Sequence, residues 1–311
     1  MRIAYMGTPE FAVPSLRALH AAGYEIAGIF TQPDRPAGRG HKMQPPPVKA
    51  AALELGLPVF QFERIRKQEG IDALRAVRAD LVVTAAFGQI LSKVLLAVPP
   101  LGTVNVHASL LPGYRGPAPI NWCIINGERE TGVTTMYTDA GIDTGDMIYA
   151  ERTEIGARET AGELTQRLSV LGAELIVRTL RDIESGVASR IPQDHEASSH
   201  HPMLTKDTGR IDWEMPAKAV DCLVRGVNPA PGAHTSVEGA PLKVWETLPV
   251  EGKGKPGQLL CADPKAGMVV ACGEGALEIV TLQAAGKAKM DARSWLRGHP
   301  LAEGQTLGGG K

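Results

Sequence analysis

Asn105 and His107 are the two residues whose types and spacing most directly suggest chemistry. They occupy alternate positions of the run Thr103–His107, which is typical of a strand, so both side chains emerge on the same face of a sheet. A neutral amide can donate a hydrogen bond to a developing oxyanion, and an imidazole can move protons near neutral pH. Either residue alone is more often a satisfied buried polar group. The pair, at the carboxyl end of a strand, predicts the wall of a ligand crevice.

Asp143 is the acid that we expect to act with this pair. It lies with Asp146 between glycines in the stretch Ala140–Met147, where an aspartate commonly stabilises its own turn. If its carboxylate converges on His107 instead, it orients the imidazole and favours the protonated ring. A metal site built from Asp139 and the two other acids is disfavoured, because no second ligand cluster accompanies them.

Cationic side chains gather in Pro33–Lys49, between a predicted strand and a predicted helix. Against one acid, this stretch carries Arg35, Arg39, Lys42 and Lys49. An exposed, solvated loop is the simpler interpretation. The stretch is nevertheless longer than the ~2–6 residues usual for such a connection, and long loops at the carboxyl ends of strands often carry function. Since arginine suits phosphates and base edges, a nucleic-acid contact is a second hypothesis.

The elements that must position these residues fall into two regions. In residues 1–188, short apolar runs alternate with helical patterns, which predicts βαβ units and a mostly parallel, Rossmann-like α/β sheet. Residues 189–206 lack periodicity and are predicted to be a linker. Residues 207–311 combine one helical pattern with short strands and turns, which predicts a smaller β-barrel domain. The tail, Gly304–Lys311, is expected to fray.

Composition narrows the classes of function. The 311 residues are 43% hydrophobic and 22% charged, which suffices for a packed core, and a net charge of −1 leaves room only for local basic patches. No window approaches ~18 uninterrupted apolar residues, so no membrane span is expected. Four cysteines without C-x-x-C spacing predict reduced thiols and a cytoplasmic protein. Only Gly7 of a G-x-G-x-x-G pattern is present, so NAD and FAD are not expected.

These motifs together resemble those of the folate-dependent formyltransferases. The N-x-H…S-L-L-P motif stands at Asn105–Pro112, is followed by Tyr114-Arg115-Gly116, and precedes Asp143 in a D-T-G-D turn. The resemblance implies a Rossmann-like formyltransferase domain and a C-terminal barrel of the oligonucleotide-binding type. It implies a catalytic set of Asn105, His107 and Asp143, and a folate-bordering segment of Ser109, Leu110, Leu111 and Pro112.

Within that family the chain is most similar to the members that formylate methionine on initiator tRNA. The similarity lies in Thr31–Lys42, in Leu282–Met290 and in Asn228–Gly232, where Ala230 replaces a tryptophan that many relatives carry. It implies 10-formyltetrahydrofolate as formyl donor, methionyl initiator tRNA as acceptor, and neither metal nor NAD; we expect a monomer. The tRNA contacts that we predict are Arg35, Arg39, Lys42, Lys287 and Lys289.

The charge balance of the second region and the existence of related enzymes keep other functions open. Residues 207–311 contain 12 basic and 12 acidic residues, so RNA affinity must come from the placement of charge. A sugar-nucleotide N-formyltransferase would use the same catalytic set, and a glycinamide ribonucleotide formyltransferase would typically lack a domain like residues 207–311. A non-catalytic RNA-binding protein is disfavoured, because all three polar residues are present.

Overall fold

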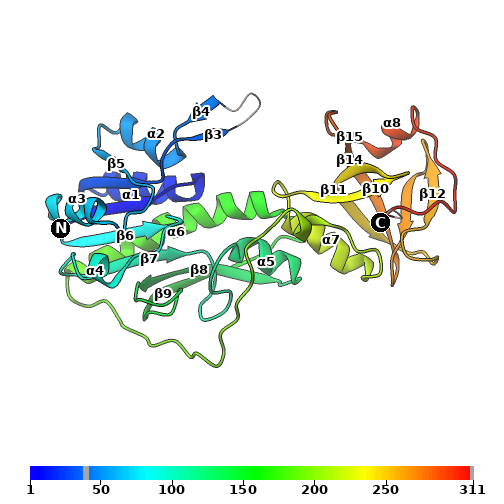
Figure 1. Ribbon diagram of the computed structural model, residues 1–311. Helices are drawn as coiled ribbons and strands as arrows, with labels where there is room; N and C mark the ends of the chain where they lie inside the picture. Colours follow the sequence, from blue (N-terminus) through cyan, green and yellow to red (C-terminus); the bar gives the residue numbers. More distant parts are fainter. Residues whose placement is uncertain (38–41, 309–311) are drawn as a thin grey trace. The chain divides into compact units, whose positions relative to one another are not determined.

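Two compact units make up the computed structural model, which describes residues 1–37 and 42–308 (Figure 1). The first unit comprises Met1–Gly116, Glu130–Thr153 and Thr165–His201, and the second comprises Pro117–Arg129, Glu154–Leu164 and Pro202–Lys311. The predicted domains, residues 1–188 and 207–311, supply most of the first and of the second unit, respectively.

A seven-stranded sheet forms the centre of the first unit, in the order β5-β2-β1-β6-β7-β8-β9. The pairings among the first five of these strands are parallel, and β8 runs antiparallel to β7. The predicted, mostly parallel sheet is therefore confirmed. Its strands are β1 Arg2–Gly7, β2 Glu25–Thr31, β5 Val59–Gln61, β6 Leu81–Ala85, β7 Thr103–His107, β8 Glu130–Tyr137 and β9 Met147–Glu154.

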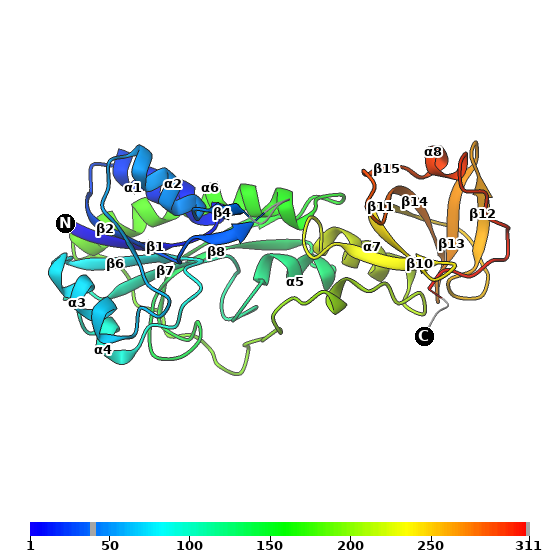
Figure 2. The same ribbon diagram turned by 45° about the horizontal axis from the view of Figure 1, so that its top comes forward.

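Helices flank both faces of this sheet, with α1, α2 and α6 on one side and α3 and α4 on the other (Figure 2). Ala4 and Met6 of β1 pack in a buried cluster with Leu74 of α3, because alternate residues of a strand share a face. On the other face, a Cβ at Gly172 of α6 would lie 2.8 Å from Val106, so glycine permits a close approach to β7. The helices are η1 Glu10–Ala12, α1 Val13–Ala21, α2 Pro47–Glu54, α3 Gln68–Ala76, α4 Lys93–Leu96 and α6 Ala161–Glu184.

The basic stretch after β2 is not the plain loop that the sequence predicts. It contains the antiparallel strands β3 (Arg35–Ala37) and β4 (Lys42–Gln44), with Pro36 opposite Met43. Hydrogen bonds between β3 and β4 satisfy backbone groups at the base of this stretch, which in an irregular chain would bond to water. The basic residue at the centre of the stretch, Arg39, lies outside the described residues.

An antiparallel sheet forms the second unit, in the order β10-β11-β14-β13-β12, with β15 paired to β14. The sheet is strongly curved in both ribbon views, as a small barrel requires (Figures 1 and 2). Its strands are β10 Ala233–Val237, β11 Ala240–Val250, β12 Leu259–Asp263, β13 Gly267–Ala271, β14 Ala276–Ala284 and β15 Met290–Asp291. The helices of this unit are α5 Pro119–Ile125, η2 Asp207–Gly209, α7 Ala217–Gly226 and α8 Ala292–Leu296.

The tail is more ordered than the sequence suggests. Leu307 is buried in the core of the second unit with 2% exposure, beside Trp213 and Leu259. The backbone N–H of Leu307 donates to the carbonyl of Gly257 at 2.8 Å, so the expectation of fraying is wrong for this residue. Burial of the apolar side chain of Leu307 stabilises the folded position of the tail.

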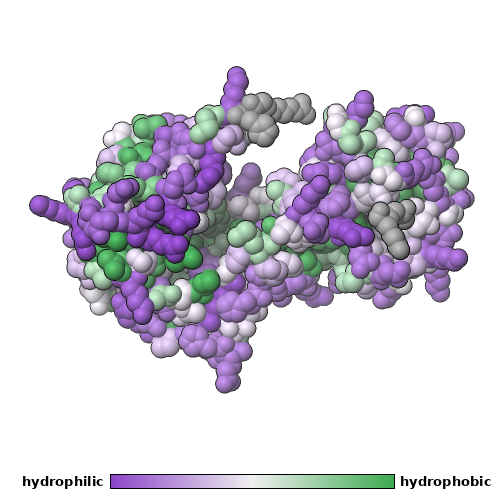
Figure 3. All heavy atoms as spheres, in the orientation of Figure 1, coloured by the Kyte–Doolittle hydropathy of each residue, from purple (hydrophilic) through white to green (hydrophobic). Residues whose placement is uncertain are grey.

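The visible face of the protein is largely hydrophilic, with hydrophobic residues in separate patches (Figure 3). Over the part of the chain that the structure describes, no helix has both the length and the apolar content needed to cross a membrane.

Candidate active site

Asn105 lies on β7 directly opposite Thr84 of the neighbouring strand β6. The hydroxyl of Thr84 donates to Oδ1 of Asn105 at 2.8 Å, which fixes the rotation of the amide. Within residues 1–37 and 42–308, Nδ2 of Asn105 has no hydrogen-bond partner. The amide can therefore offer a donor to a ligand at the carboxyl end of the parallel strands.

His107, the last residue of β7, is buried at 6% exposure. Its Nε2 lies 3.0 Å from the backbone carbonyl oxygen of Tyr114, and since a carbonyl only accepts, Nε2 must carry a proton. Its Nδ1 lies 3.7 Å from Oδ2 of Asp143, which also only accepts when ionised. Both ring nitrogens thus face acceptors, which suits the doubly protonated imidazolium.

Asp143 lies in the connection between β8 and β9, in the left-handed conformation with φ of 53°. Its Oδ2 accepts a hydrogen bond from the backbone N–H of Gly116 at 2.9 Å. The same oxygen faces His107, so the structure brings together an imidazole and a carboxylate that are far apart in the sequence. Tyr114, whose carbonyl contacts His107, also has a positive φ, of 58°.

The segment predicted to border folate, Ser109–Pro112, is held against β8 by Thr134. The hydroxyl of Thr134 donates to the carbonyl of Ser109 at 2.7 Å and accepts from the N–H of Leu111 at 3.2 Å. Ser109 and Leu111 are buried, and the hydroxyl of Ser109 donates to the carbonyl of Gly113 at 2.7 Å. The half-buried Leu110 and Pro112 are the side chains left accessible to a ligand.

The other acids of this region stabilise turns and contacts. Oδ1 of Asp139 accepts from the N–H of Gly141 at 3.0 Å and from the hydroxyl of Thr144 at 2.7 Å. Oδ2 of Asp146 lies 3.8 Å from Nη1 of Arg190, in an ion pair. The described residues contain no group of three or more histidine, cysteine, aspartate or glutamate side chains arranged to hold a metal ion.

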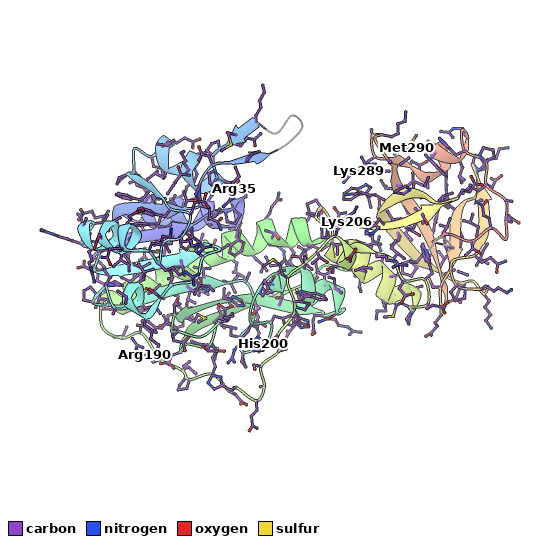
Figure 4. The ribbon with its side chains drawn as sticks, viewed as in Figure 1. Arg35, Arg190, His200, Lys206, Lys289 and Met290 are labelled. Atoms are coloured by element: carbon purple, nitrogen blue, oxygen red, sulfur yellow. The ribbon has the colours of Figure 1, made fainter. Side chains whose placement is uncertain are left out.

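The predicted tRNA contacts of the first unit lie on the β3–β4 hairpin. Arg35, labelled in Figure 4, is exposed, and its Nη2 lies 3.1 Å from Oε2 of Glu63 in an ion pair. Lys42 is exposed on the paired strand. Both cations are accessible, and the ion pair at Arg35 is the kind that solvent weakens.

Lys49, the last cation of the stretch, faces inward instead. Its Nζ lies 2.8 Å from both carboxylate oxygens of Asp34 and 2.9 Å from Oε1 of Gln61. Hydrogen bonds from Lys49 and then Gln61 lower the pKa of Asp34. These three residues close the base of the hairpin, so Lys49 stabilises the stretch that presents the other cations.

The predicted tRNA contacts of the second unit, Lys287 and Lys289, are exposed beside Trp245. Nζ of Lys289 lies 3.4 Å from the centroid of the Trp245 ring, a cation–π contact. The indole N–H of Trp245 donates to Oε1 of Gln283 at 3.0 Å, and Nε2 of Gln283 donates to the carbonyl of Lys287 at 2.7 Å. The sequence did not single out Trp245, because one tryptophan in a strand pattern is usually a core residue.

Thr84 and Tyr114 are likewise absent from the predicted site. A threonine in a strand and a backbone carbonyl give no sequence signal of contact with Asn105 or His107. The strand register and the path of the loop after β7 supply these contacts.

Comparisons with known proteins agree with this architecture. The model of the formyl transferase family matches residues 1–180, and the model of the formyl transferase C-terminal domain matches residues 203–300. The chain is 52% identical over 306 residues to the methionyl-tRNA formyltransferase of Trichlorobacter lovleyi, which covers 98% of this chain and 96% of that protein.

Two solved structures show the same fold. HypX from Aquifex aeolicus in complex with tetrahydrofolic acid has a TM-score of 0.63 and 20% identity over 95% of this chain, which spans only 47% of that protein. The sugar 3N-formyl transferase WlaRD has a TM-score of 0.65 and 16% identity over 93% of this chain and 99% of that one. With both domains matched in order and a full-length relative at 52% identity, the chain belongs to the formyl transferase family.

Proposed function

We infer that this protein transfers a formyl group to the α-amine of methionine esterified to initiator tRNA, giving N-formylmethionyl-tRNA. The observation that carries this inference is the 52% identity, over nearly the whole of both chains, to a methionyl-tRNA formyltransferase. The chain also has the C-terminal formyl transferase domain.

We propose 10-formyltetrahydrofolate as the formyl donor. Membership of the formyl transferase family and the tetrahydrofolic acid bound by the similar HypX support this choice. The accessible Leu110 and Pro112, at the end of the strand that carries Asn105, offer an apolar surface for a flat ring system. Contact of folate with Ser109–Pro112 remains a prediction.

The reaction needs one new C–N bond and the loss of another. The amine of methionine attacks the formyl carbon, and the carbonyl oxygen becomes an oxyanion in a tetrahedral intermediate. Collapse of the intermediate breaks the bond to N10 of the folate, and the proton that the amine loses balances the proton that N10 gains. The amide of Asn105, with Nδ2 available, is the group that we assign to the oxyanion.

His107 and Asp143 have complementary roles in this proposal. As an imidazolium held between the carbonyl of Tyr114 and the carboxylate of Asp143, His107 supplies positive charge to the oxyanion. The carboxylate of Asp143 accepts the proton that the amine loses, directly or by a water molecule, and the imidazolium of His107 donates the proton that N10 gains. Transfer of the proton from Asp143 to His107 then restores both groups.

We further propose that residues 1–188 form the catalytic domain, that residues 189–206 link it to the second, and that residues 207–311 contact tRNA. Arg35 and Lys42 on the hairpin, with Lys287 and Lys289 beside Trp245, would neutralise phosphates. A contact by Arg39 concerns a residue outside those described.

Sugar-nucleotide N-formyltransferases are the alternative, because WlaRD has the same fold. The identities favour the tRNA substrate, at 52% against 16%. The test supplies 10-formyltetrahydrofolate with methionyl initiator tRNA, an amino-sugar nucleotide or glycinamide ribonucleotide, and measures the formylated product. We expect only the charged tRNA to be formylated. Formylation of another acceptor at a higher kcat/KM would reject the proposed function.

A further inference from the structure

The stretch of residues 186–201, most of which falls within the linker predicted at residues 189–206, lies against the loops of the candidate site. It contains no helix and no strand of a sheet, and Arg190 and His200 mark its course in Figure 4. His200 forms an isolated bridge with Arg115, and the N–H of Arg115 donates to the carbonyl of Ser199 at 2.9 Å. The stretch is therefore part of the structure that surrounds the catalytic residues.

Gln193 makes the most extensive of these contacts, and its side chain is only 6% exposed. Its Oε1 accepts from Nε and Nη2 of Arg115, at 3.0 and 2.7 Å. Its Nε2 donates to the backbone carbonyls of Asp143 and Gly145, at 3.0 and 2.7 Å. A guanidinium only donates and a carbonyl only accepts, so this is the one orientation of the amide that satisfies all four contacts.

Arg115 has a strong need for that amide oxygen. Its side chain is 3% exposed, and across residues 1–37 and 42–308 it pairs with no carboxylate. Its remaining contact is Nη1 to Nδ1 of His195, at 3.2 Å. A buried charge is costly unless hydrogen bonds replace its hydration, so Arg115 holds Gln193 in place.

The turn that Gln193 contacts, residues 143–145, carries the carboxylate of Asp143. Asp143 has a φ of 53°, in the left-handed region that non-glycine residues seldom adopt without support. Its carboxylate reaches both the N–H of Gly116 and the ring of His107. Removal of the two bonds from Gln193 would release the backbone from which that side chain projects.

We propose that Gln193 is a positioning residue for the reaction: through the backbone of the 143–145 turn it sets the carboxylate of Asp143 against His107. The inference rests on the proposed function, since it refines the same site and adds no new chemistry. The hydrogen bonds from Arg115 fix the side chain of Gln193, and the path of residues 186–201 places Gln193 beside the 143–145 turn.

The test replaces Gln193 by methionine, which keeps the length and loses all four hydrogen bonds, and by glutamate, which keeps the acceptor for Arg115 and loses the donors. For both variants we expect kcat to fall about 10- to 100-fold, as for other groups that orient a reacting residue, with KM for charged tRNA nearly unchanged. Asp194→Asn is the matched control, because Asp194 is the exposed neighbour and, among the described residues, its carboxylate accepts a hydrogen bond only from the N–H of Glu196. It should retain wild-type turnover.

A double-mutant cycle separates positioning from general stability. Asp143→Asn keeps a residue that tolerates the left-handed conformation, and in that background Gln193→Met should cost less than about 3-fold. Multiplicative effects of the two substitutions, or wild-type turnover by both Gln193 variants, would overturn the proposal.

The NMR signals of the His107 ring give a readout that does not depend on the formyl acceptor. Gln193→Met should change the chemical shifts of the His107 ring in the same direction as Asp143→Asn does, and unchanged ring signals would contradict the proposal. If the wild-type protein formylates no tRNA, the proposed function fails, while the NMR result still decides whether Gln193 positions Asp143.

Discussion

Replacement of Asn105 tests the chemistry of the site most directly. Thr84 occupies Oδ1 at 2.8 Å, so Nδ2 is the part of the amide that faces a ligand. Loss of one oxyanion donor typically costs about 2.7–4 kcal/mol, or roughly 10²–10³ in kcat. Asn105→Asp keeps the size and the acceptor for Thr84 but removes the donor and adds a negative charge. We therefore expect at least that loss for Asn105→Asp, and a loss within that range for Asn105→Ala.

The assay measures formylation of methionyl initiator tRNA at saturating 10-formyltetrahydrofolate, with tRNA binding measured separately. We expect kcat to fall while the affinity for tRNA is retained, because the donor acts on charge that develops only in the transition state. Thr84→Val is the graded control: it removes one hydrogen bond worth about 0.5–1.5 kcal/mol and should lower kcat by roughly 2- to 10-fold.

Two results would refute this reasoning. Turnover by Asn105→Ala within a few-fold of wild type would show that another group stabilises the oxyanion. A loss confined to KM, with kcat intact, would place Asn105 in ground-state binding.

Three further predictions concern a turn of the site, two cysteines of the second unit and the β3–β4 hairpin. Gly145→Ala should lower kcat strongly, because a Cβ there would overlap the carbonyl oxygen of Tyr137 and displace the turn; wild-type turnover would contradict the packing. Burial raises the pKa of Cys272 to about 11, so its reactive thiolate is scarce below that pH; iodoacetamide at pH 8 should modify the half-buried Cys261 first, as mass spectrometry of the native and the denatured protein will show. Lys42→Ala should weaken tRNA binding and reduce its salt dependence by about one counterion while kcat stays unchanged; a loss of kcat at saturating tRNA would contradict a binding role.

Local sequence patterns account for most of the sheet in the first unit. The strand predicted at Thr103–His107 matches β7, and the strand predicted at Arg2–Met6 differs from β1 by one residue. Such runs carry strong signals because strands buried on both faces must be apolar throughout. The alternation that places Asn105 and His107 on one face is equally local, so it could be predicted without knowledge of the fold.

The contacts that tune the site could not be predicted in this way. The bond from Thr84 to Asn105 depends on the register of two strands, and the contact of Tyr114 with His107 depends on the path of a loop. Gln193 lies in a stretch with no periodicity, where composition indicates a linker. Its role depends on the fold, which buries the guanidinium of Arg115 next to it and leaves that group in want of an acceptor. A local sequence pattern does not show which residue will supply that acceptor.

The hydrogen bonds of the site also restrict which ligand atoms it can stabilise. Thr84 occupies the acceptor atom of Asn105, and one oxygen of Asp143 faces both His107 and the N–H of Gly116. The Nδ2 donor of Asn105 is then accessible, next to an imidazole whose two nitrogens face acceptors. A donor in this position suits an oxygen that gains negative charge, as the carbonyl oxygen does in acyl transfer. The carboxylate of Asp143 suits the proton that the attacking amine loses, so the arrangement supports the proposed attack on the formyl carbon.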